Sequence, residues 1–235
     1  MSRLVDYECS GAISAITMDD GKANVMSVQM LRELNAALDR AEADRGVVML
    51  TGRDGVFSAG FDLSVFKQGK APLFDMLKAG AETAERLLSF PAPVVVACGG
   101  HAIAMGAFLI LAADVRVGIL EGRSKICVNE VEIGLTVPRF AIEMCRQRLT
   151  PAYFNRAVIT AEPCDPRQAV EAGFLDVLVH APELLSAARD KATALSRLDR
   201  DALIATKRRA REGVLQALRR AIEADLEDWT RVRDA

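Results

Sequence analysis

The chain has 235 residues, a formal net charge of -2 at pH 7, 51% hydrophobic residues and only 5% aromatic residues. This length suits one large domain, or one domain with an appendage, built around a mostly aliphatic core. A net charge so close to zero gives no reason to expect nucleic acid or an anionic membrane as a partner.

The cysteines and the apolar runs indicate a soluble cytoplasmic protein. The 5 cysteines are odd in number and form no CxxC pair, which favours a reduced intracellular compartment. Charged residues near the N-terminus interrupt any apolar segment of a secretory signal. The longest apolar run, residues 102–113, is too short to cross a bilayer as a helix.

The first half of the chain alternates between predicted strands and helices. Residues 12–18 alternate in polarity and predict a strand, and Ser27 is placed to cap a helix. Residues 81–90 predict a second helix that Pro91 and Pro93 close. The continuous apolar runs at residues 47–50 and 94–97 predict strands covered on both faces. One side of the first helix carries an apolar stripe of Leu31, Leu34, Leu38 and Ala41.

The second half continues this alternation up to about residue 180. We expect a buried helix over residues 106–113 and strands over residues 115–117 and 126–131. Helices are predicted from Pro138 to about residue 149, then over residues 151–160 and 165–172. Strands that alternate with helices predict an α/β fold with mostly parallel strands.

The pattern changes near residue 183, beyond which the chain predicts helices alone. We expect a core domain over residues 1–182 and a helical C-terminal region over residues 183–235, with helices at 184–198 and 201–233. The apolar stripe of the last helix needs a partner, either the chain's own core or a neighbouring subunit. This stripe consists of Val214, Leu215, Leu218, Ile222, Leu226 and Trp229.

Chemistry is indicated by three segments, residues 57–63, 99–114 and 129–138. The last contains Glu130, just before a turn, and the first two place glycines where a backbone can approach a ligand closely. Free N–H groups at a helix start suit a developing oxyanion. Such a combination favours chemistry beside a carbonyl, where a carboxylate base forms an enolate.

An ordinary strand-to-helix turn is the alternative interpretation of residues 59–61. The glycines match neither GxGxxG nor a P-loop.

These segments resemble the conserved blocks of the enoyl-CoA hydratase/isomerase family, also called the crotonase superfamily. Residues 57–63 resemble its F-x-A-G-x-D-L block, residues 100–114 its G-x-A-x-G-x-G…D block, and residues 129–138 its P/N-E-x-x-x-G-L-x-P block. Residues 22–26 resemble its N-A-L loop. The similarity covers about residues 10–180 and implies a crotonase-like ββα spiral core, the helical C-terminal region and a homo-oligomer, either a trimer or a hexamer.

The resemblance also implies roles for individual residues. The backbone N–H groups of Phe61 and Met105 match the two oxyanion donors, although the family usually has glycine at the second position. Glu130 matches one of the two acids of the family hydratases, whereas Phe108 stands at the position of the other. The substrate is expected to be an acyl-CoA thioester, with coenzyme A as part of the substrate and no separate cofactor or metal. Predicted substrate-binding residues are Lys22, Ala23, Val25, Ala59, Gly60, Asp62, Leu63, Gly106, Phe108, Leu135 and Lys207.

The phenylalanine at position 108 favours isomerisation over hydration. Family hydratases use two carboxylates to orient and deprotonate water, whereas one base can move a proton from C2 to C4 of a 3-enoyl thioester. We therefore expect a Δ3-Δ2-enoyl-CoA isomerase with Glu130 as its base. A hydratase, a thioester or β-diketone hydrolase, and a non-catalytic acyl-CoA-binding or scaffold protein remain alternatives.

Other charged residues have less specific interpretations. Glu132 would share a strand face with Glu130, but we favour a surface or interface role for it. Glu143 is expected to pair with Arg139 or Arg146. The basic run at residues 207–211 is expected to be a solvated helix face. The alternative is that Lys207 contacts the phosphates of the ligand, from its own or from a neighbouring subunit.

Overall fold

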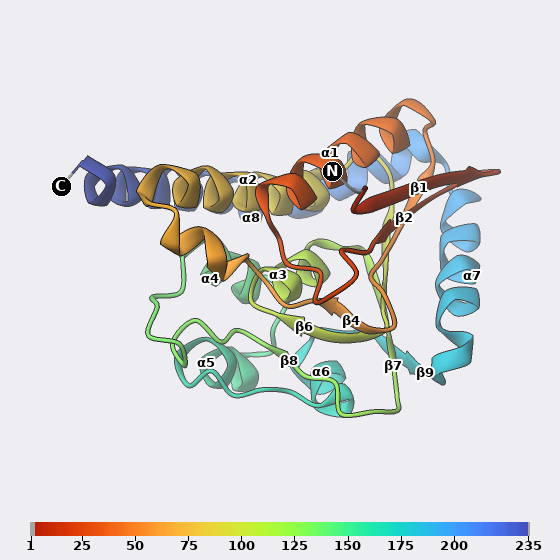
Figure 1. Cartoon of the computed structure of the whole chain (residues 1–235). Coiled ribbons are helices and arrows are strands. Elements are labelled where there is room, and N and C mark those ends of the chain that lie inside the picture. Colours follow the sequence, from red (N-terminus) through yellow and green to blue (C-terminus); the bar gives the residue numbers. More distant parts are fainter. Residues whose placement is uncertain (1–2, 235) are drawn as a thin grey trace.

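The computed structural model describes residues 3–234 and contains two β-sheets surrounded by helices (Figure 1). The larger sheet has 6 strands in the order β1-β2-β3-β5-β7-β9, and the smaller has 3 in the order β4-β6-β8. The strands are β1 Val5–Ser10, β2 Ile13–Met18, β3 Val47–Thr51, β4 Gly55–Ser58, β5 Val94–Cys98, β6 Gly100–Ile103, β7 Val115–Ile119, β8 Ile126–Cys127 and β9 Val177–Val179.

Local signals in the sequence account for several helix ends. The Ser27 side chain accepts a hydrogen bond from the Met30 N–H, as predicted, and Asp165 and Gln168 form a capping box. The helices are α1 Val28–Ala43, α2 Lys70–Ser89, α3 Met105–Ala112, α4 Arg139–Arg146, α5 Pro151–Ile159, α6 Pro166–Ala172, α7 Leu184–Ser196 and α8 Arg200–Asp234, with 3₁₀ turns η1 Leu63–Lys67 and η2 Ala181–Glu183.

The central strands β3 and β5 of the large sheet are buried on both faces, as the apolar runs predicted. Strands β3 and β5 are buried along their whole length and pair in parallel. Side chains alternate between two apolar clusters, so Val48 and Leu50 belong to one cluster while Val47 and Met49 belong to the other. The helix α7 packs on the second of these faces, and it stands apart from the other helices in Figure 1.

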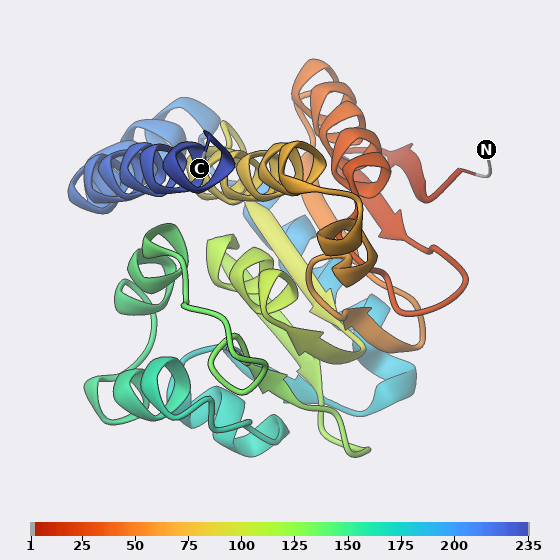
Figure 2. The same cartoon turned by 60° about the vertical axis from the view of Figure 1, so that its left-hand side comes forward.

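The last helix also finds its partner within the chain. The helix α8 runs along α2 and contacts α4, and the two views agree on this arrangement (Figures 1 and 2). Its apolar stripe, including the buried Leu218 and Ile222, joins the main core. Of the two predicted partners of this stripe, the chain's own core and a neighbouring subunit, the structure shows the first.

The predicted bounds of one helix and one strand were wrong. The helix predicted over residues 81–90 begins at Lys70, because Pro72 lies in the first turn, where its missing N–H costs little. The strand predicted over residues 126–131 ends at Cys127. Beyond it, Glu130 is not on a strand, since the Ile133 and Leu135 N–H groups bond back to the Glu130 carbonyl and form a turn.

Four strands were not predicted at all, namely β1, β4, β6 and β9. Both β4 and β6 are only 4 residues long and begin with glycine, so their sequences read as loop. Within residues 3–234, no helix is long and apolar enough to cross a membrane.

Candidate active site

The three strands of the small sheet have their carboxyl ends along the same edge of that sheet. The pairs β4–β6 and β6–β8 are both parallel, so their carboxyl ends lie along one edge of the sheet. The segments that follow these strands are residues 59–61, residues 104–105 and residues 128–130. The sheet therefore brings together the three segments that the sequence marked as functional.

Gly60 allows two of these segments to touch. Its φ is +88°, and a Cβ at this position would lie 2.9 Å from the Ile103 carbonyl oxygen and 3.0 Å from the Ala104 Cβ. The Gly60 carbonyl accepts a 2.7 Å hydrogen bond from the Met26 N–H, and the Ala59 N–H donates to the Ala23 carbonyl. Glycine is required here by both the left-handed φ and the lack of space.

The helix α3 begins at Met105, the second of the two predicted donor positions. Met105 is its first residue, and the first N–H groups of a helix have no partner within the helix. Ala104 just before it has φ 48° and ψ -116°, an unfavourable conformation for a residue with a side chain. A hydrogen bond of 2.9 Å from the Ala104 N–H to the Cys127 carbonyl holds this turn against β8. The strained turn leaves the Met105 N–H available to an anion, next to the positive end of the helix dipole.

Glu130 is the buried carboxylate of the site. Its side chain is 6% exposed, and Oε2 has no hydrogen-bond partner within the described part of the chain. Burial raises its pKa to about 7, an effect that its own backbone N–H only partly offsets. A carboxylate with this pKa is divided between its acid and base forms near neutral pH, which suits proton transfer.

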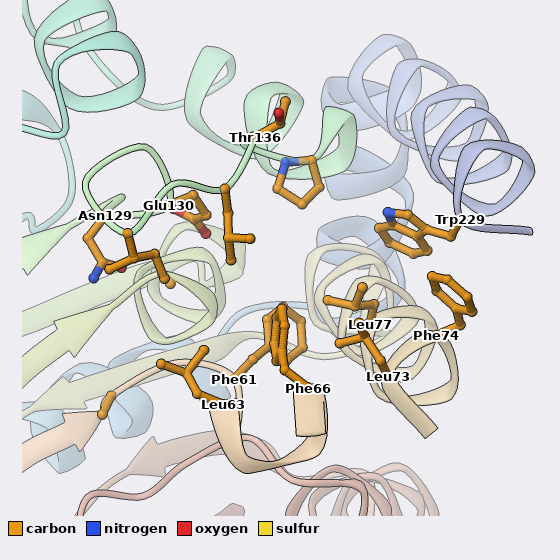
Figure 3. Close-up of a pocket in the computed structure, with 15 residues that line it drawn as sticks. Phe61, Leu63, Phe66, Leu73, Phe74, Leu77, Asn129, Glu130, Thr136 and Trp229 are labelled. Carbon is orange, nitrogen blue, oxygen red and sulfur yellow. The ribbon is translucent and has the colours of Figure 1, made fainter. Parts of the chain in front are cut away.

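A mainly apolar cavity of about 240 Å³ opens beside Glu130 (Figure 3). Of the described residues that line it, Glu130 is the only one with an ionisable side chain. The lining residues are Ala59, Phe61, Leu63, Phe66, Leu73, Phe74, Leu77, Ala104, Asn129, Glu130, Ile133, Leu135, Thr136, Pro138 and Trp229.

Several predicted site residues line this cavity, and others lie in backbone turns next to its wall without lining it. On the wall are Ala59, Phe61, Leu63, Glu130 and Leu135. Gly60 and Met105 belong to the backbone turns just described, and Asp62 caps η1 through the Ser64 N–H. The predicted coenzyme A loop of Lys22, Ala23 and Val25 packs against the Ala59–Gly60 backbone without lining the cavity.

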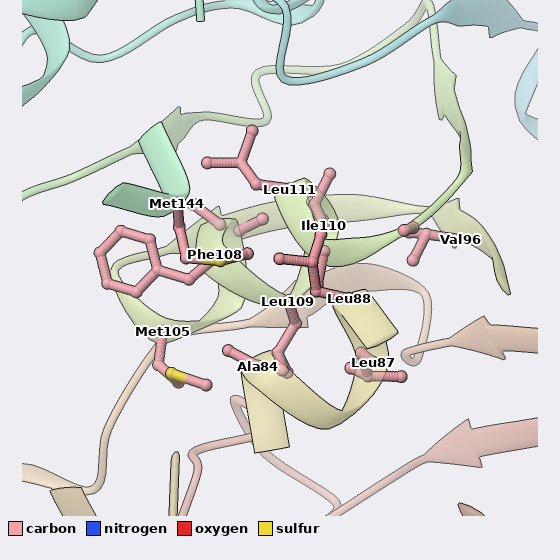
Figure 4. Close-up of a cluster of buried hydrophobic side chains, with 14 of the residues drawn as sticks. Ala84, Leu87, Leu88, Val96, Met105, Phe108, Leu109, Ile110, Leu111 and Met144 are labelled. Atoms are coloured by element: carbon pink, nitrogen blue, oxygen red, sulfur yellow. The ribbon is translucent and has the colours of Figure 1, made fainter. Parts of the chain in front are cut away.

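Three predicted substrate-binding residues need correction. The Lys207 ammonium does not reach the cavity, because it lies 2.7 Å from the Asp114 carboxylate, and the two side chains are only 8% and 20% exposed. Phe108 and Gly106 face the core instead of the cavity. The Phe108 ring packs edge to face on Phe140, near Met144, and its side chain is fully buried (Figure 4).

The remaining carboxylates of this region lie outside the cavity. Glu132 is exposed on the turn after Glu130, which agrees with a surface position and not with a shared strand face. Glu143 forms an ion pair with Arg146 at 3.2 Å, as predicted. Neither side chain lines the cavity beside Glu130.

Ten of the 15 described residues that line the cavity were not among the predicted site residues. Leu73, Phe74 and Leu77 come from the first turns of α2, which the predicted helix did not include, and Trp229 comes from α8. The spacing of residues 73, 74, 77 and 81 is helical and could have revealed the longer α2. No local signal could have placed Trp229 here.

A buried carboxylate at a cavity, beside a glycine turn and the start of a helix, is the arrangement expected of a class of enzyme that forms and stabilises an oxyanion. Similarity to known proteins specifies the family. Residues 8–234 match the family model described as enoyl-CoA hydratase/isomerase. The chain therefore belongs to the enoyl-CoA hydratase/isomerase family and is an acyl-CoA enzyme with the crotonase fold, as the sequence resemblance predicted.

Individual relatives carry both activity names of this family. A solved structure of a Mycobacterium tuberculosis protein named as an enoyl-CoA isomerase is 42% identical with a TM-score of 0.91, over 95% of this chain and 97% of that one. A second structure of the same protein names it a probable enoyl-CoA hydratase. An enoyl-CoA hydratase from Mycobacterium ulcerans is 42% identical with a TM-score of 0.92, over 97% and 99%. Carnitinyl-CoA dehydratase from Proteus mirabilis is 27% identical over 199 residues, which are 83% of this chain and 76% of the relative.

Proposed function

We propose that the protein is a Δ3-Δ2-enoyl-CoA isomerase. The observation that carries the proposal is that Glu130 is the single ionisable side chain among the described residues lining the cavity. Phe108, at the position of the second hydratase acid, is buried in the core. Hydration requires a water molecule to be held and deprotonated while C2 is protonated, and the wall of this cavity offers one carboxylate for those tasks.

In this mechanism Glu130 acts as a base and then as an acid. The carboxylate takes a proton from C2 of a 3-enoyl thioester, and the electron pair of the C2–H bond moves toward the thioester oxygen. The Phe61 and Met105 N–H groups hold the enolate, and each such donor contributes about 3 kcal/mol to transition-state stabilisation. Protonated Glu130 then returns the proton at C4, so the double bond moves to C2–C3 with no change in composition.

The experiment that tests this proposal compares two substrates. Purified protein is incubated with a 3-enoyl-CoA and, separately, with the 2-enoyl-CoA of the same chain length, and products are separated by chromatography. We expect conversion of the 3-enoyl to the 2-enoyl thioester, with slower hydration of the latter. Rapid hydration of the 2-enoyl thioester without isomerisation would instead support a hydratase, the name given to the M. ulcerans relative.

The pH dependence of catalysis should follow the titration of Glu130. Because the base must be ionised in the free enzyme and burial raises its pKa to about 7, kcat/KM should rise with pH and level off above this value. Initial rates with a 3-enoyl-CoA between pH 5.5 and 9 measure this profile. A profile that is flat across this range would contradict the assignment of Glu130 as the base.

Gly80 should be required for the position of Phe61. A Cβ at Gly80 would lie 2.5 Å from the Phe61 ring, so the Gly80→Ala variant should displace this ring and the backbone donor attached to it. We expect kcat/KM to fall by about tenfold to a hundredfold, since small misplacements are costly at reacting groups. Gly213→Ala on α8 is the matched control, because a Cβ there meets no atom within 4 Å. Equal activity of the two variants would show that Phe61 is not positioned by α2.

Three further expectations from the sequence stay predictions. They are a homo-oligomeric assembly, a cytoplasmic location, and the absence of any cofactor beyond the coenzyme A part of the substrate.

A further inference from the structure

Trp229 occupies the end of the cavity that lies farthest from the base. Figure 3 shows Glu130 and Asn129 on one side and Trp229 with Phe74 on the other, with Phe61 and Phe66 between them. The neighbours of Trp229 on the cavity wall, Leu73, Phe74 and Leu77, all come from α2. An acyl chain that extended through the cavity from Glu130 would therefore pass aromatic and aliphatic side chains before it met the indole.

A buried carboxylate on the same helix, one turn before Trp229, ties α8 to the start of α4. Asp225 is 3% exposed and accepts hydrogen bonds from the Arg139 N–H at 3.0 Å and the Phe140 N–H at 2.9 Å. These are the first N–H groups of α4, which directly follows Pro138 of the cavity wall. Asp225 and Trp229 are four residues apart and so share a helix face. The Arg139 side chain also contacts Asp228, which adds a second tie between α8 and α4.

The apolar side chains around Trp229 favour an apolar ligand at this end of the cavity. The side chains around Trp229 are aliphatic or aromatic, and none of the described lining residues there is charged. A polymethylene chain gains from burial in such surroundings at about 0.8 kcal/mol, or about fourfold in affinity, per methylene. A hydroxylated or charged chain end would lose its hydration without finding a partner.

We propose that Trp229 closes the acyl subsite and sets the longest fatty-acyl chain that the protein accepts. The substrates are then thioesters of simple, apolar acyl chains that end at the indole. This inference rests on the proposed function in that the acyl group is assumed to bind beside Glu130.

Binding of saturated acyl-CoA thioesters tests the inference without any catalysis. Titration calorimetry with the series from butyryl-CoA to palmitoyl-CoA is performed on the full chain and on Trp229→Ala. For the unmodified protein we expect affinity to rise about fourfold per methylene and then to stop rising or fall at one chain length. In Trp229→Ala this limit should move to longer chains by two or more carbons.

The control is Leu226→Ala, which removes an apolar side chain from the same helix without touching the cavity. Its chain-length limit should equal that of the unmodified protein. An unchanged limit in Trp229→Ala would overturn the inference. If that variant does not fold by circular dichroism, Trp229→Leu replaces it and should show a smaller shift in the same direction. A shifted limit together with no isomerisation would refute the proposed reaction and leave the role of Trp229 intact.

Discussion

Replacement of Glu130 with glutamine is expected to lower kcat for a 3-enoyl-CoA by about 10²- to 10⁴-fold, with little change in KM. The size of this effect is that of a positioned general acid–base group. Glutamine keeps the shape of the side chain, so the cavity and the backbone donors of Phe61 and Met105 should be retained. Steady-state kinetics together with acyl-CoA binding measure the separation of catalysis from binding.

The neighbouring carboxylates provide matched controls for this variant. Glu132→Gln alters an exposed residue of the same turn, and Glu143→Gln removes a surface ion pair with Arg146. Both variants should retain activity within about twofold. A loss in Glu132→Gln as large as in Glu130→Gln would mean that two acids take part, and hydration would then be the better interpretation. If Glu130→Gln instead left the protein's physiological activity in cells unchanged, the non-catalytic scaffold alternative would be favoured.

The same substitution is expected to stabilise the fold at alkaline pH. The folded-state pKa of Glu130 is about 7, above the ordinary value of 4.5, because the carboxyl is buried. A raised carboxyl pKa means that the folded state favours the protonated form. The associated stability is fully present below pH 4.5 and is lost as pH rises through 7. At pH 8 the ionised side chain therefore destabilises the protein by about 3 kcal/mol relative to its neutral form.

Urea denaturation at pH 5 and pH 8 measures this effect. Glutamine is neutral at both values, so the free energy of unfolding of Glu130→Gln should gain about 2 to 3 kcal/mol relative to the unmodified protein between pH 5 and pH 8. Glu132→Gln should show a much smaller change, because that side chain is exposed. Equal pH dependence in all three proteins would show that Glu130 is solvated in the folded state.

A loss of kcat together with a gain in stability at pH 8 in Glu130→Gln would show that the catalytic carboxylate lowers the stability of the fold. A carboxylate that is well solvated or paired would be more stable, but its pKa would lie too low for efficient proton return to a carbon atom. Burial without a hydrogen-bond partner on Oε2 raises the pKa toward neutrality. The destabilisation and the expected catalytic role therefore have the same physical origin.

Much of the fold could be predicted because its signals are local. Apolar runs identified β3 and β5, the serine at position 27 identified the start of α1, and the helical character beyond residue 183 was correct. The strands β4 and β6 were not predicted because each has only 4 residues, which are too few to show a period. Yet these short strands are what bring the ends of the three functional segments to one edge of the small sheet.

The family, the carboxylate at position 130 and the two proposed backbone donors could be inferred from the sequence, since each depends on a short motif whose residues are adjacent in the chain. The tertiary structure was needed to show how deeply Glu130 is buried, that Phe108 and Lys207 point away from the cavity, and that Trp229 reaches it. Burial and cavity walls depend on contacts between residues far apart in the chain, as between α2 and α8. Such contacts are set by the packing of whole helices, which no local pattern encodes.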